Sequence, residues 1–302
     1  MIEPPGVERD SVVTSLGTMV YYSPQKAPWV EDNLDSTTEK PTLIFLHGFG
    51  GGSSAYEWSK VYPAFAFNYR VLAPDLLGWG RSDHPERNYQ PQDYINTILE
   101  FIEKTCEQPP TVIASSLVGG LTLRAAIARP DQFKNLILTN PTGLSDFGED
   151  YSKNLFAQIV GVPVIDKMIY SVGVANSTAI QGFLETKQFA NPNLLYPEIT
   201  EAYLESATQP NAEYAALSFV RGDLCFDLAK YIPQLTIPTA FMWGQKASFA
   251  GPDVGKRLAA LNGTAIKLFQ EIEDVGLTPQ LELPAVTISL INKFLKYFQN
   301  VS

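Results

Sequence analysis

From Thr42 to Gly52 the chain reads TLIFLHGFGGG, an apolar run behind one threonine that ends in a histidine and a cluster of glycines. An unbroken run of this kind is typical of a strand covered on both faces, as in a parallel sheet. The glycines let backbone N–H groups converge on developing negative charge. The GxxxxGK[ST] spacing of nucleotide-binding loops is lacking, and a plain flexible turn is the alternative interpretation.

Further strands and helices alternate along the chain. Buried strands are predicted at 70–73, 111–113, 135–139, 239–243 and 266–269, and helical patterns lie near 54–65, 91–104, 117–128, 252–261 and 284–298. A short hairpin is predicted over 11–22. This alternation predicts an α/β fold with a mostly parallel sheet flanked by helices, and a binding crevice at the carboxyl ends of the strands.

The alternation of strands and helices is interrupted between residues 144 and 235. That stretch is rich in aromatic residues, Asn and Pro, and it has amphipathic segments without an intervening buried strand. We interpret it as a helical cap inserted between two core strands, so that 1–143 and 236–302 form the core.

Composition excludes several classes of partner. The 302 residues carry 22 basic and 32 acidic side chains, a net charge of −10, which repels phosphate backbones and argues against nucleic acid as a partner. Cys106 and Cys225 lack CxxC spacing, so neither zinc site nor disulfide framework is expected, and a reducing, cytoplasmic location is predicted. The start MIEPPGVERD does not resemble a signal peptide, and no uncharged run approaches the 18 residues of an integral membrane segment. No motif supports a metal, flavin or nicotinamide cofactor. The oligomeric state is left open.

Five landmarks in order carry a family resemblance: HGFG at 47–50, DLLGWGRSD at 75–83, a serine at a strand-to-helix corner, NLILTNPTG at 135–143 and IPTAFMWG at 237–244. Together they resemble the α/β-hydrolase superfamily, in its epoxide hydrolase, haloperoxidase and esterase-like branch. The tryptophan of LGWGRSD and the stretch EWSKVYP from Glu57 are also similar to chlorophyll- and pheophytin-ester hydrolases.

The resemblance implies that Ser116 holds the nucleophile position at a sharp elbow, with the backbone N–H groups of Phe49 and Leu117 as the oxyanion hole. The family's small residues around the serine are replaced by Ala114 and Val118. A β-branched valine argues against an unmodified elbow.

The resemblance also indicates a degenerate triad. Leu277 stands where the family has its histidine base, and Ala247 where it has the aspartate that orients the histidine. Neither side chain can titrate. His84 and Asp274 are possible displaced bases, although each is more simply a solvated loop residue.

Three functions follow from these residues. The first is a pseudo-hydrolase that binds a small lipophilic ligand or is weakly active. The second is an active serine hydrolase of a lipophilic ester or thioester, using Ser116 and a displaced base. The third is a non-hydrolytic enzyme such as a lyase on the same scaffold, because one fold hosts many chemistries.

Overall fold

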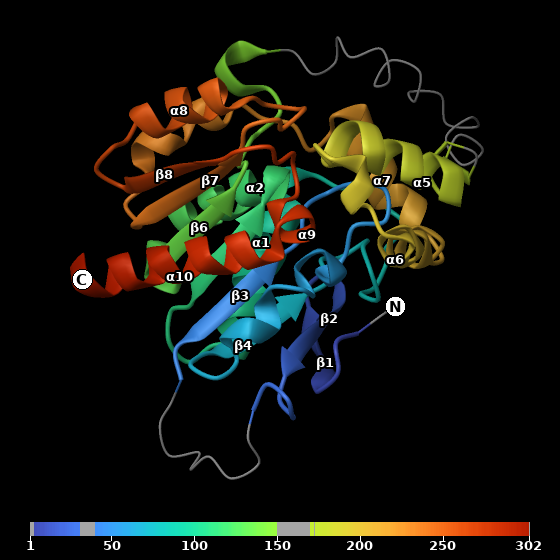
Figure 1. The fold of residues 1–302 in the computed structure, drawn as a ribbon, viewed down its shortest axis with the longest axis horizontal. Helices are drawn as coiled ribbons and strands as arrows, with labels where there is room; N and C mark the ends of the chain where they lie inside the picture. Colours follow the sequence, from blue (N-terminus) through green and yellow to red (C-terminus); the bar gives the residue numbers. More distant parts are fainter. Residues whose placement is uncertain (1–2, 31–39, 150–169, 172, 302) are drawn as a thin grey trace.

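The computed structural model describes residues 3–30, 40–149, 170–171 and 173–301. Within these residues the strands form one eight-stranded sheet in the order β1-β2-β4-β3-β5-β6-β7-β8 (Figure 1). β2 pairs antiparallel with both β1 and β4, and all other neighbours run parallel. In chain order the strands span Val7–Thr14, Gly17–Pro24, Thr42–Leu46, Arg70–Pro74, Thr111–Ser115, Asn135–Thr139, Thr239–Gly244 and Ile266–Ile272.

The predicted α/β architecture is confirmed. The runs at 42–46 and 135–139 are the whole of β3 and β6, and the other four predicted strands extend by one to three residues. The hairpin is longer than predicted, from Val7 to Pro24.

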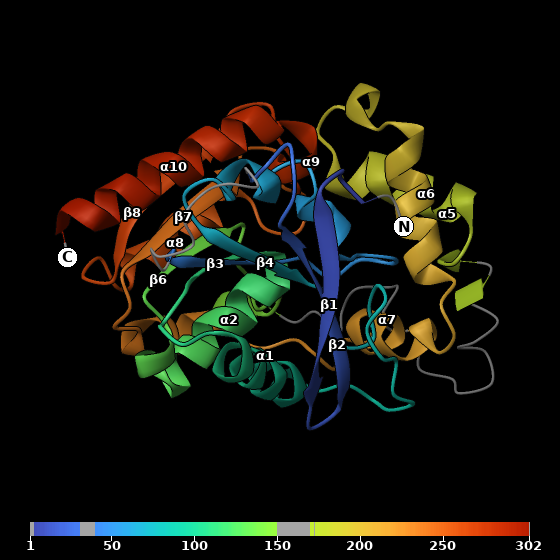
Figure 2. The ribbon, with the colours of Figure 1, turned by 90° about the horizontal axis from the view of Figure 1, so that it is seen from below.

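Helices cover both faces of the sheet, which explains why its strands are apolar on both sides. Ile44 and Leu46 of β3 pack toward α1, α2 and α8, whereas Leu43 and Phe45 pack toward α10. Figure 2 shows α1 and α2 on one side of the sheet and α10 on the other. These helices span Pro91–Thr105 (α1), Ser116–Ala128 (α2), Pro252–Ala260 (α8) and Pro284–Val301 (α10), with the short α9 at Pro279–Glu282.

One predicted helix has a different form. The segment 54–65 folds as two 3₁₀ helices, Ala55–Trp58 and Tyr62–Phe65. Pro63 has no N–H group and its ring clashes with the preceding turn, so an α-helix that began at Ala55 could not continue through it.

Between β6 and β7 the chain forms helices that lie apart from those covering the two faces of the sheet. The α-helices among its described residues are α5 (Ser177–Phe183), α6 (Pro197–Ala207) and α7 (Ala212–Arg221), drawn in yellow and gold in Figure 1. α6 meets the glycine loop after β3 so closely that a Cβ on Gly52 would lie 2.1 Å from the Tyr203 carbonyl oxygen. Of the predicted cap 144–235, residues 150–169 and 172 lie outside the described residues.

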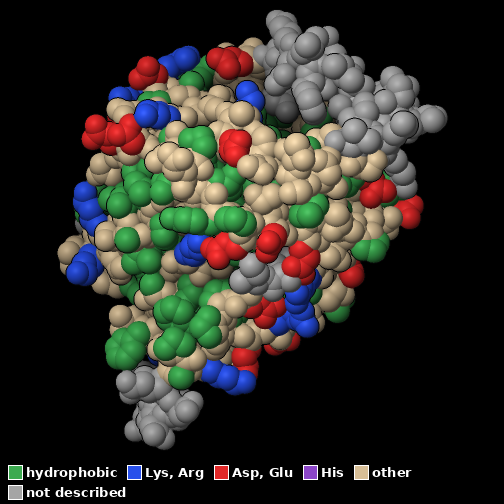
Figure 3. Space-filling model, turned by 45° about the vertical axis from the view of Figure 1, so that its right-hand side comes forward, with side chains coloured by type: hydrophobic (Ala, Val, Ile, Leu, Met, Phe, Trp, Pro, Cys, Tyr) green, Lys and Arg blue, Asp and Glu red, His purple; other side chains and the backbone are tan. Residues whose placement is uncertain are grey.

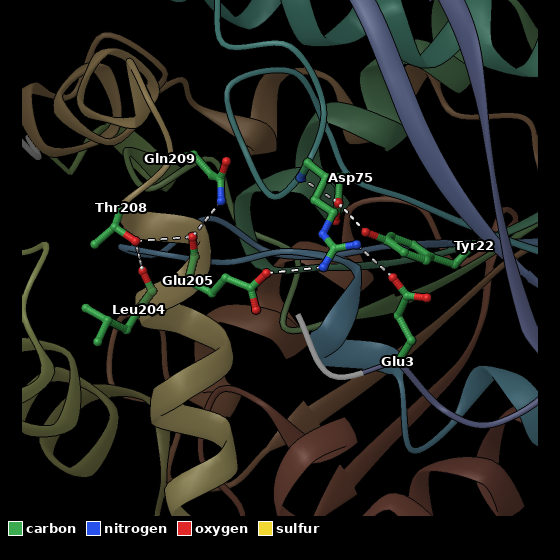
Figure 4. Close-up of polar contacts among 8 residues, drawn as sticks. Glu3, Tyr22, Asp75, Leu204, Glu205, Thr208 and Gln209 are labelled. Carbon is green, nitrogen blue, oxygen red and sulfur yellow. Dashed lines mark hydrogen bonds and ion pairs between the residues drawn. The ribbon is translucent and has the colours of Figure 1, made fainter.

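An arginine ties the loop after β4 to two distant segments. The Arg81 guanidinium pairs with Glu3 near the N-terminus at 3.0 Å and with Glu205 of α6 at 3.2 Å. In the same loop the Asp75 carboxylate accepts from the Arg81 N–H at 2.8 Å and from the Tyr22 hydroxyl at 3.1 Å. Figure 4 shows Glu3, Tyr22, Asp75 and Glu205 converging from these elements. The inserted helices are therefore joined to the core by charge as well as by packing.

The surface mixes both signs of charge. On the face drawn in Figure 3, acidic and basic side chains are interspersed. The most exposed large apolar side chains, Val13, Phe67 and Tyr196, belong to three separate segments, which is ordinary for a folded protein. None of the helices in the described ranges is both long enough and apolar enough to cross a membrane.

Candidate functional site

Ser116 lies at a sharp corner between β5 and α2. Its φ of 54° is left-handed, a conformation that non-glycine residues adopt only where the surroundings compensate for the strain. Close packing behind the corner explains the neighbouring glycines, because a Cβ on Gly120 would lie 2.5 Å from the Thr142 carbonyl oxygen. Val118 is fully buried, and the left-handed corner forms in its presence.

The resemblance gives the backbone N–H groups of Leu117 and Phe49 to the oxyanion hole. Leu117 is the second residue of α2, where a helix has no internal partner for its N–H. Phe49 lies in the glycine loop with its ring stacked on Trp79, the ring centroids 4.8 Å apart. Neither N–H group donates a hydrogen bond to an acceptor among the described residues.

His47 is fixed as a neutral structural residue. Its Nε2 accepts the Leu76 N–H at 3.0 Å, and its Nδ1 lies 2.7 Å from the Gly48 carbonyl oxygen, to which it donates. Complete burial lowers the pKa of His47 to about 4. With both ring nitrogens engaged, this histidine has no free atom with which to take a proton from Ser116.

The loops after β7 and β8 place apolar side chains at the two positions that the resemblance gives to the triad. Ala247 and Leu277 are both buried. The Leu277 N–H donates to the Gln188 carbonyl oxygen at 2.7 Å. Asn140, which follows β6, accepts the Gly244 N–H at 2.8 Å and donates to the Leu277 carbonyl oxygen at 2.9 Å. The backbones of both loops are therefore held from a third strand without any triad side chain.

The two proposed displaced bases lie in other surroundings. The Asp274 side chain is 75% exposed and pairs with Lys246 at 2.6 Å. The His84 Nε2 lies 3.2 Å from the Gly80 carbonyl oxygen, and burial lowers the pKa of its imidazole. Among the described residues, no hydrogen bond or ion pair joins either side chain to Ser116. The geometry offers neither residue support as the base.

A buried glutamate that the sequence analysis did not single out lies behind the glycine loop. Glu57 is 1% exposed. Its Oε2 accepts the Gly48 N–H at 2.8 Å, and its Oε1 accepts the Tyr203 hydroxyl at 2.9 Å. The Gln280 Nε2 donates to the Ser115 Oγ at 3.3 Å in the same wall and also lies against Glu57. Burial raises the pKa of the Glu57 carboxyl group, against the opposing effect of these hydrogen bonds. The sequence holds one local sign of this residue, because Glu57 is the one charged residue in the run AYEW.

The described part of the chain contains no group of three His, Cys, Asp or Glu side chains placed to hold a metal ion.

Comparison with known proteins points to one fold. A family model described as the alpha/beta hydrolase fold matches residues 41–163. A protein of Mycobacterium tuberculosis is 24% identical over 84% of this chain and 75% of its own length, and epoxide hydrolase 4 of Mus musculus is 25% identical over 70% and 60%. The solved structure of the epoxide hydrolase CorEH superposes with a TM-score of 0.76 at 20% identity, covering 98% of this chain and all of that one. With the strand order and the corner at Ser116, these matches show that the chain has the α/β-hydrolase fold.

Proposed function

We propose that this chain is a ligand-binding or weakly active pseudo-hydrolase that lacks efficient Ser-His-Asp catalysis. The observation that carries the proposal is the pair of buried apolar residues at the triad positions, Leu277 and Ala247. A serine hydroxyl is a weak nucleophile until a base takes its proton. In subtilisin, loss of the triad histidine lowers kcat by about 10⁶-fold. The rate enhancement that is left over the reaction in water is only about 10³- to 10⁴-fold.

The proposed ligand is a small lipophilic molecule with an acceptor oxygen. The N–H groups of Phe49 and Leu117 supply two donors at the serine, in the arrangement of an oxyanion hole. Leu277 and Ala247 supply apolar surface in place of charged groups. The residues 144–235 would act as the cap over this site. Two half-buried free cysteines fit a proposed cytoplasmic location.

An active serine hydrolase is the second candidate, and the left-handed corner favours it. A φ of 54° at Ser116 costs energy, and such strain is concentrated at functional sites. A chain that only bound ligands through its cap would have no need of this serine geometry.

The test is reaction of the full chain with a fluorophosphonate, with Ser116→Ala as the control, while turnover of p-nitrophenyl esters of increasing chain length is followed. We expect labelling at Ser116 that is slow compared with that of a complete triad, turnover near background, and saturable binding of lipophilic esters. Turnover at ordinary enzyme rates, abolished by Ser116→Ala, would contradict the proposal and favour the second candidate.

A further inference from the structure

A groove lies between the last strand of the sheet and the last helix. It has a volume of about 660 Å³ and is lined by Leu268 of β8 and by side chains along one side of α10. Figures 1 and 2 show β8 and the C-terminal end of α10 at the opposite end of the molecule from α5, α6 and α7. No residue of this groove belongs to the loops around Ser116. A ligand held here would therefore bind independently of the proposed function.

The groove is basic although the chain is acidic. The net charge of the chain is −10, yet α10 has no Asp or Glu and places Lys293 and Lys296 in the groove. Neither lysine forms an ion pair among the described residues, and the Lys293 Nζ has only the Gln270 Oε1 at 3.3 Å. Glu271, the acidic residue of β8, pairs instead with Lys256 of α8 at 2.7 Å. Two ammonium groups without a counter-charge favour an anionic occupant.

β8 also has one side that no other strand covers. It is the last strand in the order of the sheet and pairs only with β7 within the described residues. The outer N–H and C=O groups of an edge strand are a template for the addition of another strand. Because Leu268 belongs to β8 and also lines the groove, a strand added at this edge would lie along the groove.

A side-chain amide already occupies part of this edge. The Ile272 carbonyl oxygen accepts the Gln245 N–H on the β7 side at 3.0 Å, so the preceding carbonyl group, that of Glu271, points to the outer edge. There it accepts the Gln270 Nε2 at 2.9 Å, while the Gln270 Oε1 faces Lys293. A carboxamide has the donor and the acceptor of a peptide group. Gln270 therefore makes the two contacts that a peptide group of an incoming strand would make.

We propose that the groove between β8 and α10 binds an extended acidic segment of a partner protein, which adds as a strand to β8 and places carboxylates against Lys293 and Lys296. Hydrogen bonds to the strand edge supply affinity that does not depend on the peptide sequence. Every second side chain of the added strand faces the groove and supplies specificity. Leu268 and Tyr297 offer apolar surface to these side chains, and the lysines select carboxylates.

Other occupants match the groove less well. Nucleic acid is repelled by the net charge of −10. A second copy that met this one groove to groove would bring the lysines of both α10 helices together, because a twofold interface pairs the same surface with itself. An anionic membrane surface would attract the lysines but would leave the edge of β8 without hydrogen-bond partners. An acidic peptide satisfies both the charge and the strand edge.

The test is binding of two fluorescein-labelled peptides to the full chain, followed by fluorescence anisotropy at low and high salt. In the first peptide Glu alternates with Thr, and in the second Lys replaces each Glu. We expect saturable binding of the acidic peptide that weakens at high salt, and no binding of the basic peptide. Thr is a good strand former, so both peptides can adopt the extended conformation that strand addition requires.

Charge reversal within the groove supplies the decisive comparison. Lys293→Glu and Lys296→Glu should each weaken binding of the acidic peptide by about 5-fold or more, because an ion pair is lost and a repulsion is added. Both lysines are exposed on α10, so both variants should fold. Lys134→Glu is the matched control, since it makes the same charge change at an exposed lysine outside the groove. It should change the affinity by less than about 2-fold.

Hydrogen exchange tests the strand addition itself. With the acidic peptide bound, the backbone amides of β8 should exchange more slowly, whereas those of β1 at the other edge of the sheet should be unchanged. The proposal is overturned if the acidic peptide does not bind, if the basic peptide binds equally well, if Lys293→Glu and Lys296→Glu behave like Lys134→Glu, or if β8 gains no protection. Lysine-dependent binding to phosphatidylserine vesicles instead of the peptide, or a dimer of the chain alone that Lys293→Glu dissociates, would also overturn it and would assign the groove to a membrane surface or to a second copy.

Discussion

Replacing Asp75 by alanine should destabilise the fold far more than the same change at Asp83 in the same loop. Asp75 is completely buried and accepts three hydrogen bonds, from the Ala55 N–H at 2.7 Å, the Arg81 N–H at 2.8 Å and the Tyr22 hydroxyl at 3.1 Å. A buried donor left without an acceptor costs about 1–3 kcal/mol. Because the three costs share one site and do not simply add, we expect a loss of at least about 3 kcal/mol in the free energy of unfolding.

Asp83 is the matched control. It is exposed, and its Oδ2 accepts the Thr18 N–H at 2.7 Å. Asp83→Ala should therefore cost only about 0.5–1.5 kcal/mol. In urea at pH 7, with a slope of about 3 kcal/mol per M, Asp75→Ala should lower the unfolding midpoint by about 1 M or more and Asp83→Ala by at most about 0.5 M.

The stability cost of Asp75→Ala should depend on pH. Burial raises the pKa of Asp75 from its ordinary value to about 6 in the folded chain. Between the ordinary pKa of an aspartate and about 6, the folded state therefore binds more protons than the unfolded state. The stability that this group contributes is full at low pH and is lost as pH rises through about 6. The cost of Asp75→Ala should thus grow by about 1 kcal/mol when the pH falls from 7 to 5. Equal midpoints for the Asp75 and Asp83 variants, or a cost that shrinks toward pH 5, would refute this reasoning.

Three further outcomes are expected. Restoring the triad positions with Leu277→His and Ala247→Asp should raise ester turnover by about 10²-fold or more, and an unchanged rate in a folded double variant would show that these positions do not face the serine. Gly120→Ala should lower stability by about 1–3 kcal/mol in thermal unfolding, because its Cβ would lie 2.5 Å from the Thr142 carbonyl oxygen. Arg81→Gln should cost less than about 2 kcal/mol, since both of its ion pairs are part-exposed, and a cost that does not fall in high salt would contradict an ionic origin.

The sheet could be predicted because its signal is local. Each strand of a doubly covered parallel sheet is apolar along its whole length, so β3 and β6 could be delimited from their own residues. The place of Asp75 directly after a predicted strand also favours a turn role, because carboxylates in such places commonly accept nearby backbone N–H groups, as Asp75 does from Arg81. The helix expected over 54–65 was wrong in type, since apolar spacing does not register that Pro63 removes a hydrogen bond.

Glu57 could not be found in this way. Its burial depends on Tyr203 and Gln280, which lie 146 and 223 positions further along the chain, and no periodicity in the sequence links them. A family resemblance pointed instead to the position of the histidine base, which holds Leu277, and to that of the aspartate that orients it, which holds Ala247. The sequence therefore showed that the triad side chains are missing at Leu277 and Ala247. It did not show that the fold buries the carboxyl group of Glu57 near the glycine loop.

The geometry of the site does not depend on the residues of a triad. Asn140 has a left-handed φ of 46° and holds both the Gly244 N–H and the Leu277 carbonyl oxygen, so it fixes the loops after β7 and β8 from the end of β6. His47 fixes the glycine loop from the other side through Leu76. Because such backbone-directed hydrogen bonds rigidify a site whichever side chains line it, replacing a histidine by leucine need not loosen the donors at Phe49 and Leu117. A scaffold of this kind can keep a binding site while its proton chemistry is lost, and ester turnover of the full chain, measured beside the labelling of Ser116, tests whether that has happened.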